Sequence, residues 1–326
     1  MPDIRIAIVG ESLIDFTATS GLNFEGHEGG APTNSAIATA RLGQAIGFIS
    51  QLSTDLFGER LLNHLESNGV DTRWVLRSDA PSTLAFVERT PLTNRYAFYT
   101  QGTADTQWNP TTLPTLPDSC RFLQFGSISL LHEPAASRII DLVQAQQGQP
   151  RPCIVLFDPN VRLSLIKDLP AFRANVYRWS ASSNLMKFSD EDAAALAPDL
   201  SLAEVAASFM AHASSGPRAV VITRGGDGAT LFRRGHAPLE ITAPKITVAD
   251  TIGAGDTFDA GLTVALLEHG VEQVAQLDSL PDATWLAVLR FAAQAAAINC
   301  TREGANPPTR AELQLALDAQ AQLQQA

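Results

Sequence analysis

The sequence is poor in cysteine and in positive charge. Among its 326 residues it has 3 cysteines, Cys120, Cys153 and Cys300, and no Cys-x-x-Cys pair, so neither a disulfide framework nor a zinc site is indicated. Lysine and arginine number 23 against 34 acidic residues, a net charge of −11. Such an acidic chain is a poor match for a surface that follows nucleic-acid phosphates, and we expect no nucleic-acid partner.

Targeting signals and membrane spans are also missing. The opening segment MPDIRIAIVG has no basic region followed by a long apolar core, so no signal peptide is predicted. Every apolar run is shorter than a membrane-spanning helix requires. With 45% hydrophobic and 17% charged residues, the composition is that of a folded protein with a substantial core. We expect a cytoplasmic protein with no membrane partner.

Two common nucleotide-binding motifs are absent. Gly10 is followed by Glu11, Ser12 and Leu13 rather than by a Gly-x-Gly-x-x-Gly pattern, which argues against a dinucleotide-binding oxidoreductase. The glycine-rich run that ends at Asp256 is not followed by Gly-Lys-Ser/Thr, so it is not a Walker A loop.

Strand and helix patterns alternate along most of the chain. Short apolar runs predict strands at 4–9, 46–52, 122–125, 153–157 and 219–223. Helical spacing predicts helices at 32–42, 57–67, 134–146, 257–269, 284–299 and 310–324. This order predicts an α/β protein with a mostly parallel sheet that is covered on both faces.

Two segments, about 11–29 and 82–107, break this rhythm. Polar and apolar residues alternate in them, as in Thr83-Leu84-Ala85-Phe86-Val87-Glu88. Alternation of this kind is typical of strands with one solvated face, so we expect a small antiparallel sheet beside the main one. The pattern is equally consistent with a lid over a site and with two surface hairpins.

The run Gly253-Ala254-Gly255-Asp256 precedes a predicted helix and predicts chemistry. Small residues allow several backbone N–H groups to point at one place, and a helix N-terminus adds a positive dipole end, so the run is suited to an anion. An acid at its end is placed to accept a proton from a hydroxyl that attacks a phosphate. Aspartate is also a common N-cap, and this run alone leaves the two interpretations evenly matched.

A second segment, Gly29-Gly30-Ala31-Pro32-Thr33-Asn34, also leads into a helix. Consecutive glycines permit close backbone approach to a ligand, and the Asn34 amide offers both a donor and an acceptor to hydroxyls. Read alone, the segment is more typical of a tight turn before a helix that packs through small residues.

Taken together, in this order, the two segments resemble the two signatures of the PfkB (ribokinase-like) carbohydrate kinase family. The resemblance covers nearly the whole chain and is strongest to fructokinases. Its further motifs are Gly10-Glu11-Ser12-Leu13-Ile14-Asp15-Phe16, Phe125-Gly126-Ser127-Ile128-Ser129-Leu130, Phe157-Asp158-Pro159-Asn160-Val161-Arg162, Lys187-Phe188-Ser189-Asp190-Glu191-Asp192 and Thr223-Arg224-Gly225-Gly226-Asp227-Gly228. It implies one ribokinase-like domain over 1–326, a three-layer sandwich with a mostly parallel central sheet and a small β lid.

The resemblance also implies roles for individual residues. Asp256 would be the general base, and the amides of Gly253, Ala254 and Gly255 would hold the transferred phosphoryl group. The sugar would be bound by Asp15, Gly30, Asn34, Phe98 and Arg162. ATP would lie against Lys187, Thr223, Gly225, Gly228 and Asn299.

Metal ions follow from the same resemblance. Asp250, the carbonyl of Ile252 and Gly304 match a monovalent-cation loop, which implies K⁺. ATP implies Mg²⁺, which the family holds through an Asn-x-x-Glu motif. Here Ser189 and Asp192 occupy those positions, so the acid is shorter and the amide is lost. The neighbouring Asp190 and Glu191 could take the place of Asp192 beside the ion.

The implied activity is phosphorylation of a neutral sugar by ATP. Thr100 stands where the related lid pattern usually has an arginine, and sugar-acid kinases use basic lid residues, so fructose is favoured over 2-keto-3-deoxygluconate. A ribokinase and a non-catalytic sugar sensor stay open as well. Family lids often pair in dimers, and we expect a homodimer through an exposed face with Tyr96, Phe98 and Trp108.

Overall fold

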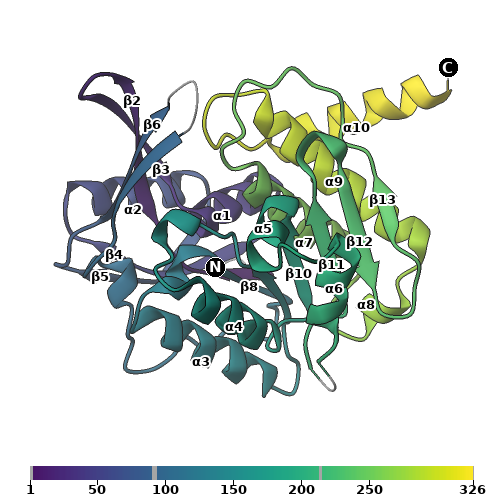
Figure 1. Ribbon diagram of the computed structural model, residues 1–326, viewed down its shortest axis with the longest axis horizontal. Coiled ribbons are helices and arrows are strands. Elements are labelled where there is room, and N and C mark those ends of the chain that lie inside the picture. The colour runs from purple at the N-terminus through teal and green to yellow at the C-terminus, as the bar shows by residue number, and fades with distance from the viewer. Residues whose placement is uncertain (1–2, 90–93, 213–214, 326) are drawn as a thin grey trace.

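The computed structural model describes residues 3–89, 94–212 and 215–325. In this part of the chain a large twisted sheet runs through the molecule, with helices on both of its faces and a smaller sheet projecting at one end (Figure 1). This is the three-layer α/β sandwich that the alternating pattern predicts.

The large sheet is parallel over most of its width. Its order is β13 (Leu239–Ile241), β12 (Ala229–Arg233), β11 (Ala219–Thr223), β10 (Leu185–Ser189), β9 (Ile154–Asp158), β8 (Phe122–Gly126), β1 (Ile6–Val9), β4 (Ile46–Ser53) and β5 (Asp71–Ser78). From β11 to β5 neighbouring strands are parallel, whereas β12 and β13 are antiparallel additions at one edge. The carboxyl ends of the parallel strands therefore meet at one edge, where ligands bind in open α/β sheets.

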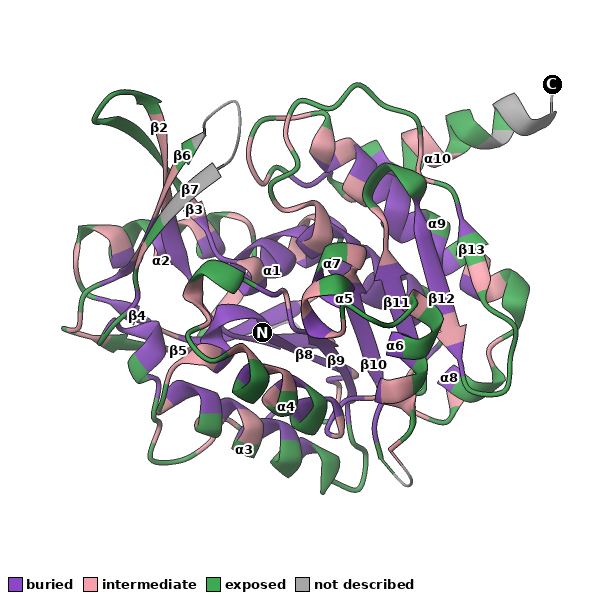
Figure 2. Cartoon of the chain, viewed as in Figure 1, coloured by how far each residue is buried: buried purple, intermediate pink, exposed green. Residues whose placement is uncertain are grey.

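Each face of the sheet has its own apolar core. Ile6 and Ile8 of β1 belong to one core, and Ala7 and Val9, which point the other way, belong to the other. The first core is covered by α1 (Ala31–Arg41), α2 (Leu56–Ser67), α7 (Ala254–Glu268), α8 (Gln276–Ser279), α9 (Asp282–Cys300) and α10 (Arg310–Gln325). The second is covered by α3 (Ala135–Gln147), α4 (Leu169–Ser180), α5 (Asp190–Leu196) and α6 (Leu202–Met210). The central strands are accordingly buried (Figure 2).

Most predicted boundaries agree with the structure to within a residue or two, but one shift bears on function. The predicted helix at 257–269 is α7, which begins at Ala254, inside the glycine-rich run. The helix contains Ala254, Gly255 and Asp256 in its first turn, and the residue that caps it is Gly253. The short 3₁₀ turns of the chain are η1 (Asp105–Gln107), η2 (Ser127–Leu131), η3 (Leu163–Leu165) and η4 (Gly225–Asp227).

The smaller sheet is the predicted lid. It has the order β3 (Asn23–Gly29), β2 (Leu13–Ser20), β6 (Thr83–Arg89) and β7 (Asn94–Tyr99), and positions 90–93 of the predicted segment lie outside the described residues. Two antiparallel hairpins are joined by a parallel pairing of β2 with β6. The register aligns Asp15 with Ala85 and Ala85 with Phe98, so these three share one face. Phe16 and Phe86 stack on the opposite face.

The exposed face predicted for the dimer is wrong in one residue, Trp108. Trp108 is only 2% exposed, because the chain turns at η1 after the lid and sends this ring into the second core. Phe98 packs beside Leu13 and Ala85, on the lid face that carries Asp15. The side chain of Tyr96 lies outside the described part of the structure. The alternating pattern does not reach Trp108, because β7 ends at Tyr99.

None of the described helices combines the length and apolar character needed to cross a membrane.

Candidate active site

The first turn of α7 lies at the carboxyl edge of the large sheet. Its N-cap, Gly253, has φ 73°, and a Cβ there would come within 2.7 Å of the Ala305 Cβ, so glycine is required on both counts. The cap has no side-chain hydrogen bond, and the amides of a first helical turn lack partners within the helix. Of the predicted anion-binding amides, that of Ala254 donates to the Thr251 carbonyl at 3.2 Å.

Asp256 is not a helix cap. Its Oδ2 accepts a hydrogen bond from Asn34 Nδ2 at 2.8 Å, across the interface between α7 and α1, and its backbone carbonyl accepts one from Ser35 Oγ at 3.1 Å. The side chain is buried, and burial raises its pKa to about 6, opposed by the Asn34 hydrogen bond and the Lys187 charge. The capping interpretation is therefore excluded, and the carboxylate is held with a pKa close to neutral pH, as suits a general base.

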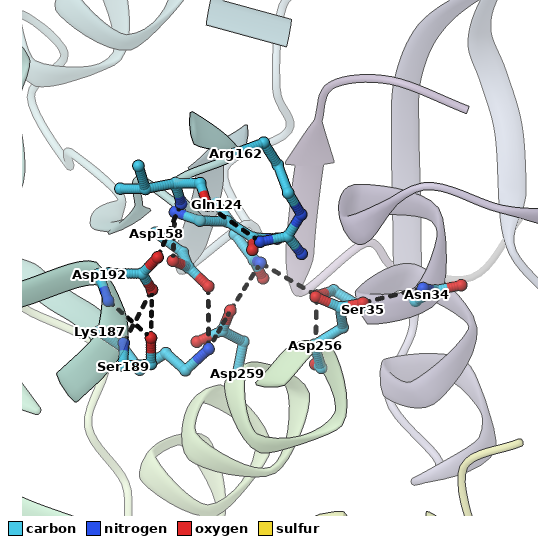
Figure 3. Close-up of polar contacts among 12 residues, drawn as sticks. Asn34, Ser35, Gln124, Asp158, Arg162, Lys187, Ser189, Asp192, Asp256 and Asp259 are labelled. Atoms are coloured by element: carbon cyan, nitrogen blue, oxygen red, sulfur yellow. Dashed lines mark hydrogen bonds and ion pairs between the residues drawn. The ribbon is translucent and has the colours of Figure 1, made fainter. Parts of the chain in front are cut away.

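A buried ion cluster lies beneath this turn (Figure 3). Lys187 Nζ lies 2.9 Å from Asp158 Oδ2 and 3.7 Å from Asp259 Oδ2. Burial alone lowers the pKa of Lys187, but Asp158 and Asp259 raise it well above its usual value. A Cβ on Gly255 would stand 2.9 Å from the ammonium, so the lysine charge lies directly under the predicted anion-binding turn.

Asp259 follows Asp256 by one helical turn and completes the cluster. It is 1% exposed, and burial raises its pKa well above the usual value, with the Lys187 charge opposing. Gln124 of β8 donates from Nε2 to Ser35 Oγ at 3.1 Å and to Asp259 Oδ2 at 3.4 Å. Gln124 thus connects the sheet to both α1 and α7 behind the first turn of α7.

Three of the predicted sugar-binding residues, Asp15, Asn34 and Arg162, lie near Asp256. Asp15 is on β2 of the lid, and burial raises its pKa to about 6, with Arg162 lowering it and Asp256 raising it. Arg162 is exposed and also lowers the pKa of Asp256, so its guanidinium lies within electrostatic reach of both acids. Asn34 is on α1 and donates a hydrogen bond to Asp256.

The glycines of this region have different requirements. Gly30 has φ 102°, and its Cβ position lies 3.0 Å from the Glu11 carbonyl. A Cβ on Gly29 would lie 2.4 Å from Asp15 Oδ2. Gly29 therefore lets the carboxylate of Asp15 lie against the backbone, whereas Gly30 lets the chain pass close to Glu11.

Three of the predicted nucleotide-binding residues, Thr223, Gly225 and Gly228, lie on a different part of the edge from Lys187, which belongs to the buried cluster. Thr223 ends β11, and η4 follows with Gly225 at its start. Gly228 has φ 100°, and its Cβ position lies 1.9 Å from the Ile241 carbonyl, which leaves no room for a side chain. Gly225 has φ 49° with open space around it. The turn thus presents bare backbone to solvent, as a surface for a flat nucleotide requires.

The predicted monovalent-cation residues are brought together. Asp250 Oδ2 accepts from the Gly304 amide at 3.2 Å, and Asp250 Oδ1 accepts from the amides of Thr251 and Ile252 at 2.7 and 3.2 Å. The buried amide of Asn299 donates to the Ile252 carbonyl at 2.8 Å and accepts from the Asn306 amide at 2.8 Å. Asn299 thus joins the two loops, rather than lining an open pocket. These oxygens are of the type that a hard cation such as K⁺ prefers, but each of them already accepts an amide hydrogen bond, as those of Asp192 do.

Asp192, the predicted magnesium contact, is engaged by the protein. Its Oδ1 accepts from the Val161 amide at 2.8 Å, and its Oδ2 accepts from the amide and hydroxyl of Ser189 at 2.9 and 2.8 Å. Ser189 and Asp192 form a capping box at the start of α5. These bonds do not fit a direct metal ligand.

Comparison with known proteins agrees with this geometry. Residues 3–312 match the model of the pfkB family of carbohydrate kinases. This chain belongs to that family. It is 36% identical over 282 residues to a fructokinase of Rhizobium leguminosarum bv. trifolii, a match that covers 84% of each chain. It is 31% identical over 313 residues to a probable fructokinase-3 of Arabidopsis thaliana, covering 93% of this chain and 87% of that protein.

Among solved structures, the PfkB chain resembles a fructokinase of Xylella fastidiosa with bound ATP. The TM-score is 0.85 at 25% identity, and the match covers 98% of this chain and 100% of the other. The ribokinase-like fold expected from the motifs is thereby confirmed, as is a carbohydrate-kinase function.

Sequence reasoning missed several residues of this PfkB site. Ser35 and Asp158 lie within or beside the family motifs, yet those motifs gave them no role, and Gln124 and Asp259 were not singled out. A usable signal was present for Gln124, because it is a polar residue in the otherwise apolar run Phe122–Gly126. Asp259 could have been found as the acid one helical turn beyond Asp256, on the same face.

Proposed function

We propose that this PfkB kinase is a fructokinase, which converts D-fructose and ATP to D-fructose 6-phosphate and ADP. The observation that carries the proposal is the Asp256 carboxylate, which is buried at a helix N-terminus, held by Asn34 and given a pKa of about 6. The fructokinases among its relatives support the choice of sugar.

In the proposed reaction Asp256 accepts the proton of the primary hydroxyl of the sugar. The hydroxyl oxygen forms a bond to the γ-phosphorus, and the bond from that phosphorus to the β–γ bridging oxygen breaks, which releases ADP. Asp15, Gly30, Asn34 and Arg162 would orient the sugar, with Phe98 packed against it. Negative charge that develops on the phosphoryl oxygens would be stabilised by the first-turn amides of α7, with the buried Lys187 beneath them.

ATP would lie along the turn of Thr223, Gly225 and Gly228, with its phosphates directed toward α7. Mg²⁺ would arrive with the ATP phosphates and neutralise their charge. Because the oxygens of Asp192 are engaged by amides and a hydroxyl, we give that residue the role of fixing α5 and assign it no direct metal bond. By the family resemblance, Asp250, the Ile252 carbonyl and the Gly304 loop would hold K⁺, which would stabilise the backbone that leads into Gly253. The amide hydrogen bonds to Asp250 and to the Ile252 carbonyl bring these groups together.

A screen of ADP release over fructose, ribose, 2-keto-3-deoxygluconate, adenosine and fructose 6-phosphate tests the proposal. We expect the highest kcat/KM with fructose. Preference for the sugar acid would replace fructokinase with 2-keto-3-deoxygluconate kinase, and preference for ribose would replace it with ribokinase. Sugar binding without ADP release from any of them would point to the non-catalytic sensor.

Replacement of K⁺ by Na⁺ or a bulky organic cation tests the cation loop. We expect turnover to fall, and unchanged turnover would refute the assignment. One domain over the whole chain, a homodimer and a cytoplasmic location stay predictions.

A further inference from the structure

Glu11 is a buried acid that none of the assigned roles uses. It lies between β1 of the large sheet and β2 of the lid, and its side chain is 1% exposed. Its Oε1 accepts a hydrogen bond from Ser127 Oγ at 2.6 Å, and its Oε2 accepts one from the Ser129 amide at 3.1 Å. Burying a carboxyl group costs free energy unless its oxygens accept hydrogen bonds. Both oxygens of Glu11 accept theirs from one loop that is distant in the sequence, so we expect Glu11 to fix that loop.

The loop that Glu11 holds has an unfavourable backbone. Ser127 has φ 59°, a left-handed backbone conformation that residues other than glycine rarely adopt. The preceding Gly126 is tightly confined, because a Cβ there would come 1.8 Å from the Asp158 carbonyl. Ser127 lines the same small cavity as Asp256 and Asp158. The conformation of Ser127 therefore shapes the wall next to the proposed base.

The backbone of Glu11 joins the same wall to two parts of the sugar-binding side. Its carbonyl accepts a hydrogen bond from Thr33 Oγ1 at 3.1 Å, one residue before Asn34. The lid strand that carries Asp15 begins at Leu13, directly after the Glu11-Ser12 link. Glu11 thus connects the start of the lid, the Asn34 segment and the Ser127 wall.

We propose that Glu11 is a positioning residue for the sugar, which holds Ser127 in its left-handed conformation and fixes the wall against the base of the lid. The proposal rests on the proposed function, because it requires a sugar beside Asp256. The buried Asp105 of η1 is near enough for its negative charge to add to the effect of burial on Glu11. Burial raises the pKa of Glu11 to about 7.

The test compares Glu11→Ala with Glu11→Gln, measuring the KM of the sugar and the KM of ATP separately. Alanine leaves Ser127 and the Ser129 amide without their acceptor, so we expect the sugar KM to rise tenfold or more while the ATP KM stays within twofold. Glutamine has nearly the same shape and keeps an acceptor for the amide, so we expect the sugar KM to return to within about threefold of wild type. Asp105→Asn is the control for loss of a buried acid near the lid that does not hold Ser127.

Ser127 variants distinguish positioning from general stability. Glycine adopts φ 59° without strain, so Ser127→Gly should recover most of the sugar KM in the Glu11→Ala background. If Glu11→Ala does not fold, the comparison of Ser127→Ala with Ser127→Gly tests the proposal instead. We expect the alanine variant to have the higher sugar KM. Equal sugar KM values for these two, or parallel rises of sugar and ATP KM in Glu11→Ala, overturn the proposal. Failure of the wild-type protein to phosphorylate any sugar would instead refute the proposed function.

Discussion

The part of the site proposed for the sugar, around Asp256, and the part proposed for the nucleotide, at the turn 223–228, rely on different chemical groups. On the sugar side Asn34 and Asp256 are buried side chains bonded to each other, and the buried pair of Lys187 and Asp158 lies beneath the adjoining turn of α7. On the nucleotide side they are backbone groups of an exposed turn, where Gly225, Gly226 and Asp227 face solvent. The buried charges on the first side contact one another, whereas the second side depends on the absence of a side chain at Gly225, Gly226 and Gly228.

This difference fits the two ligands. A sugar is small and polar, and each of its hydroxyls needs a placed partner once water is excluded. A nucleotide is larger and can lie on bare backbone. The protein therefore needs an open surface there, with glycines in a turn that has positive φ values. Mutations on the sugar side should therefore act through charge and hydrogen bonding, and those on the nucleotide side through steric contact.

The largest expected effect is that of Asp256→Asn. The amide keeps the shape of the side chain and removes both the base and its charge, so turnover should fall by a factor of about 10²–10⁴, with sugar and ATP binding nearly retained. Steady-state kinetics and calorimetric binding measure the two quantities. Asp199→Asn, which changes an exposed acid in the loop between α5 and α6, is the matched control and should leave turnover near wild type. A rate near wild type for Asp256→Asn would remove Asp256 as the base.

The second-largest expected effect is a loss of stability in the variant Lys187→Met. Methionine fills a similar volume but leaves Asp158 and Asp259 buried without their cation, which should cost about 3–5 kcal/mol in the free energy of unfolding. Urea denaturation measures it. Arg218→Met breaks a surface pair with Asp278, in which the side chains are 43% and 49% exposed, and should cost less than about 1 kcal/mol. Equal losses for the two variants would contradict the buried-cluster interpretation.

The sequence predicts features that are set locally and misses hydrogen bonds between distant segments, for a physical reason. Gly228 and Gly253 have positive φ values and stand directly before a strand and a helix, respectively. A glycine at such a position indicates a positive φ from the local sequence alone. The Asn34–Asp256 bond joins residues 222 positions apart, so spacing shows nothing of it. For the same reason the sequence gives no sign of the role of Glu11, whose partners come from a distant loop. The alternation of strands and helices along the chain was predictable, because apolar runs and helical periodicity are local features of the sequence.

On the nucleotide side, Gly228→Ala should act through one steric contact. The added Cβ would meet the Ile241 carbonyl at 1.9 Å in a left-handed backbone, so we expect a loss of roughly 1–3 kcal/mol in stability and a higher ATP KM. Gly148→Ala, at the end of α3 and away from the nucleotide turn, is the control, because its φ is −78° and its Cβ position has only ordinary contacts, of 3.6 and 3.9 Å. Thermal denaturation and the KM of ATP are the measurements. If the two variants behave alike, steric fit at this turn is not what shapes the nucleotide side.

The smallest effect expected is a shift in the pH dependence of kcat/KM. Because Asp256 must be ionised to accept a proton and burial raises its pKa to about 6, kcat/KM should fall tenfold for each pH unit below about 6. Asn34→Ala removes a hydrogen bond to the carboxylate, so the acid limb should move to higher pH. Asp15→Asn removes a negative charge that repels the charge of Asp256, so the limb should move to lower pH in that variant. Shifts in the same direction would show that the limb reports a group other than Asp256. Opposite shifts would show that the sugar side tunes its base by paired charges and hydrogen bonds, for which the exposed nucleotide turn has no counterpart.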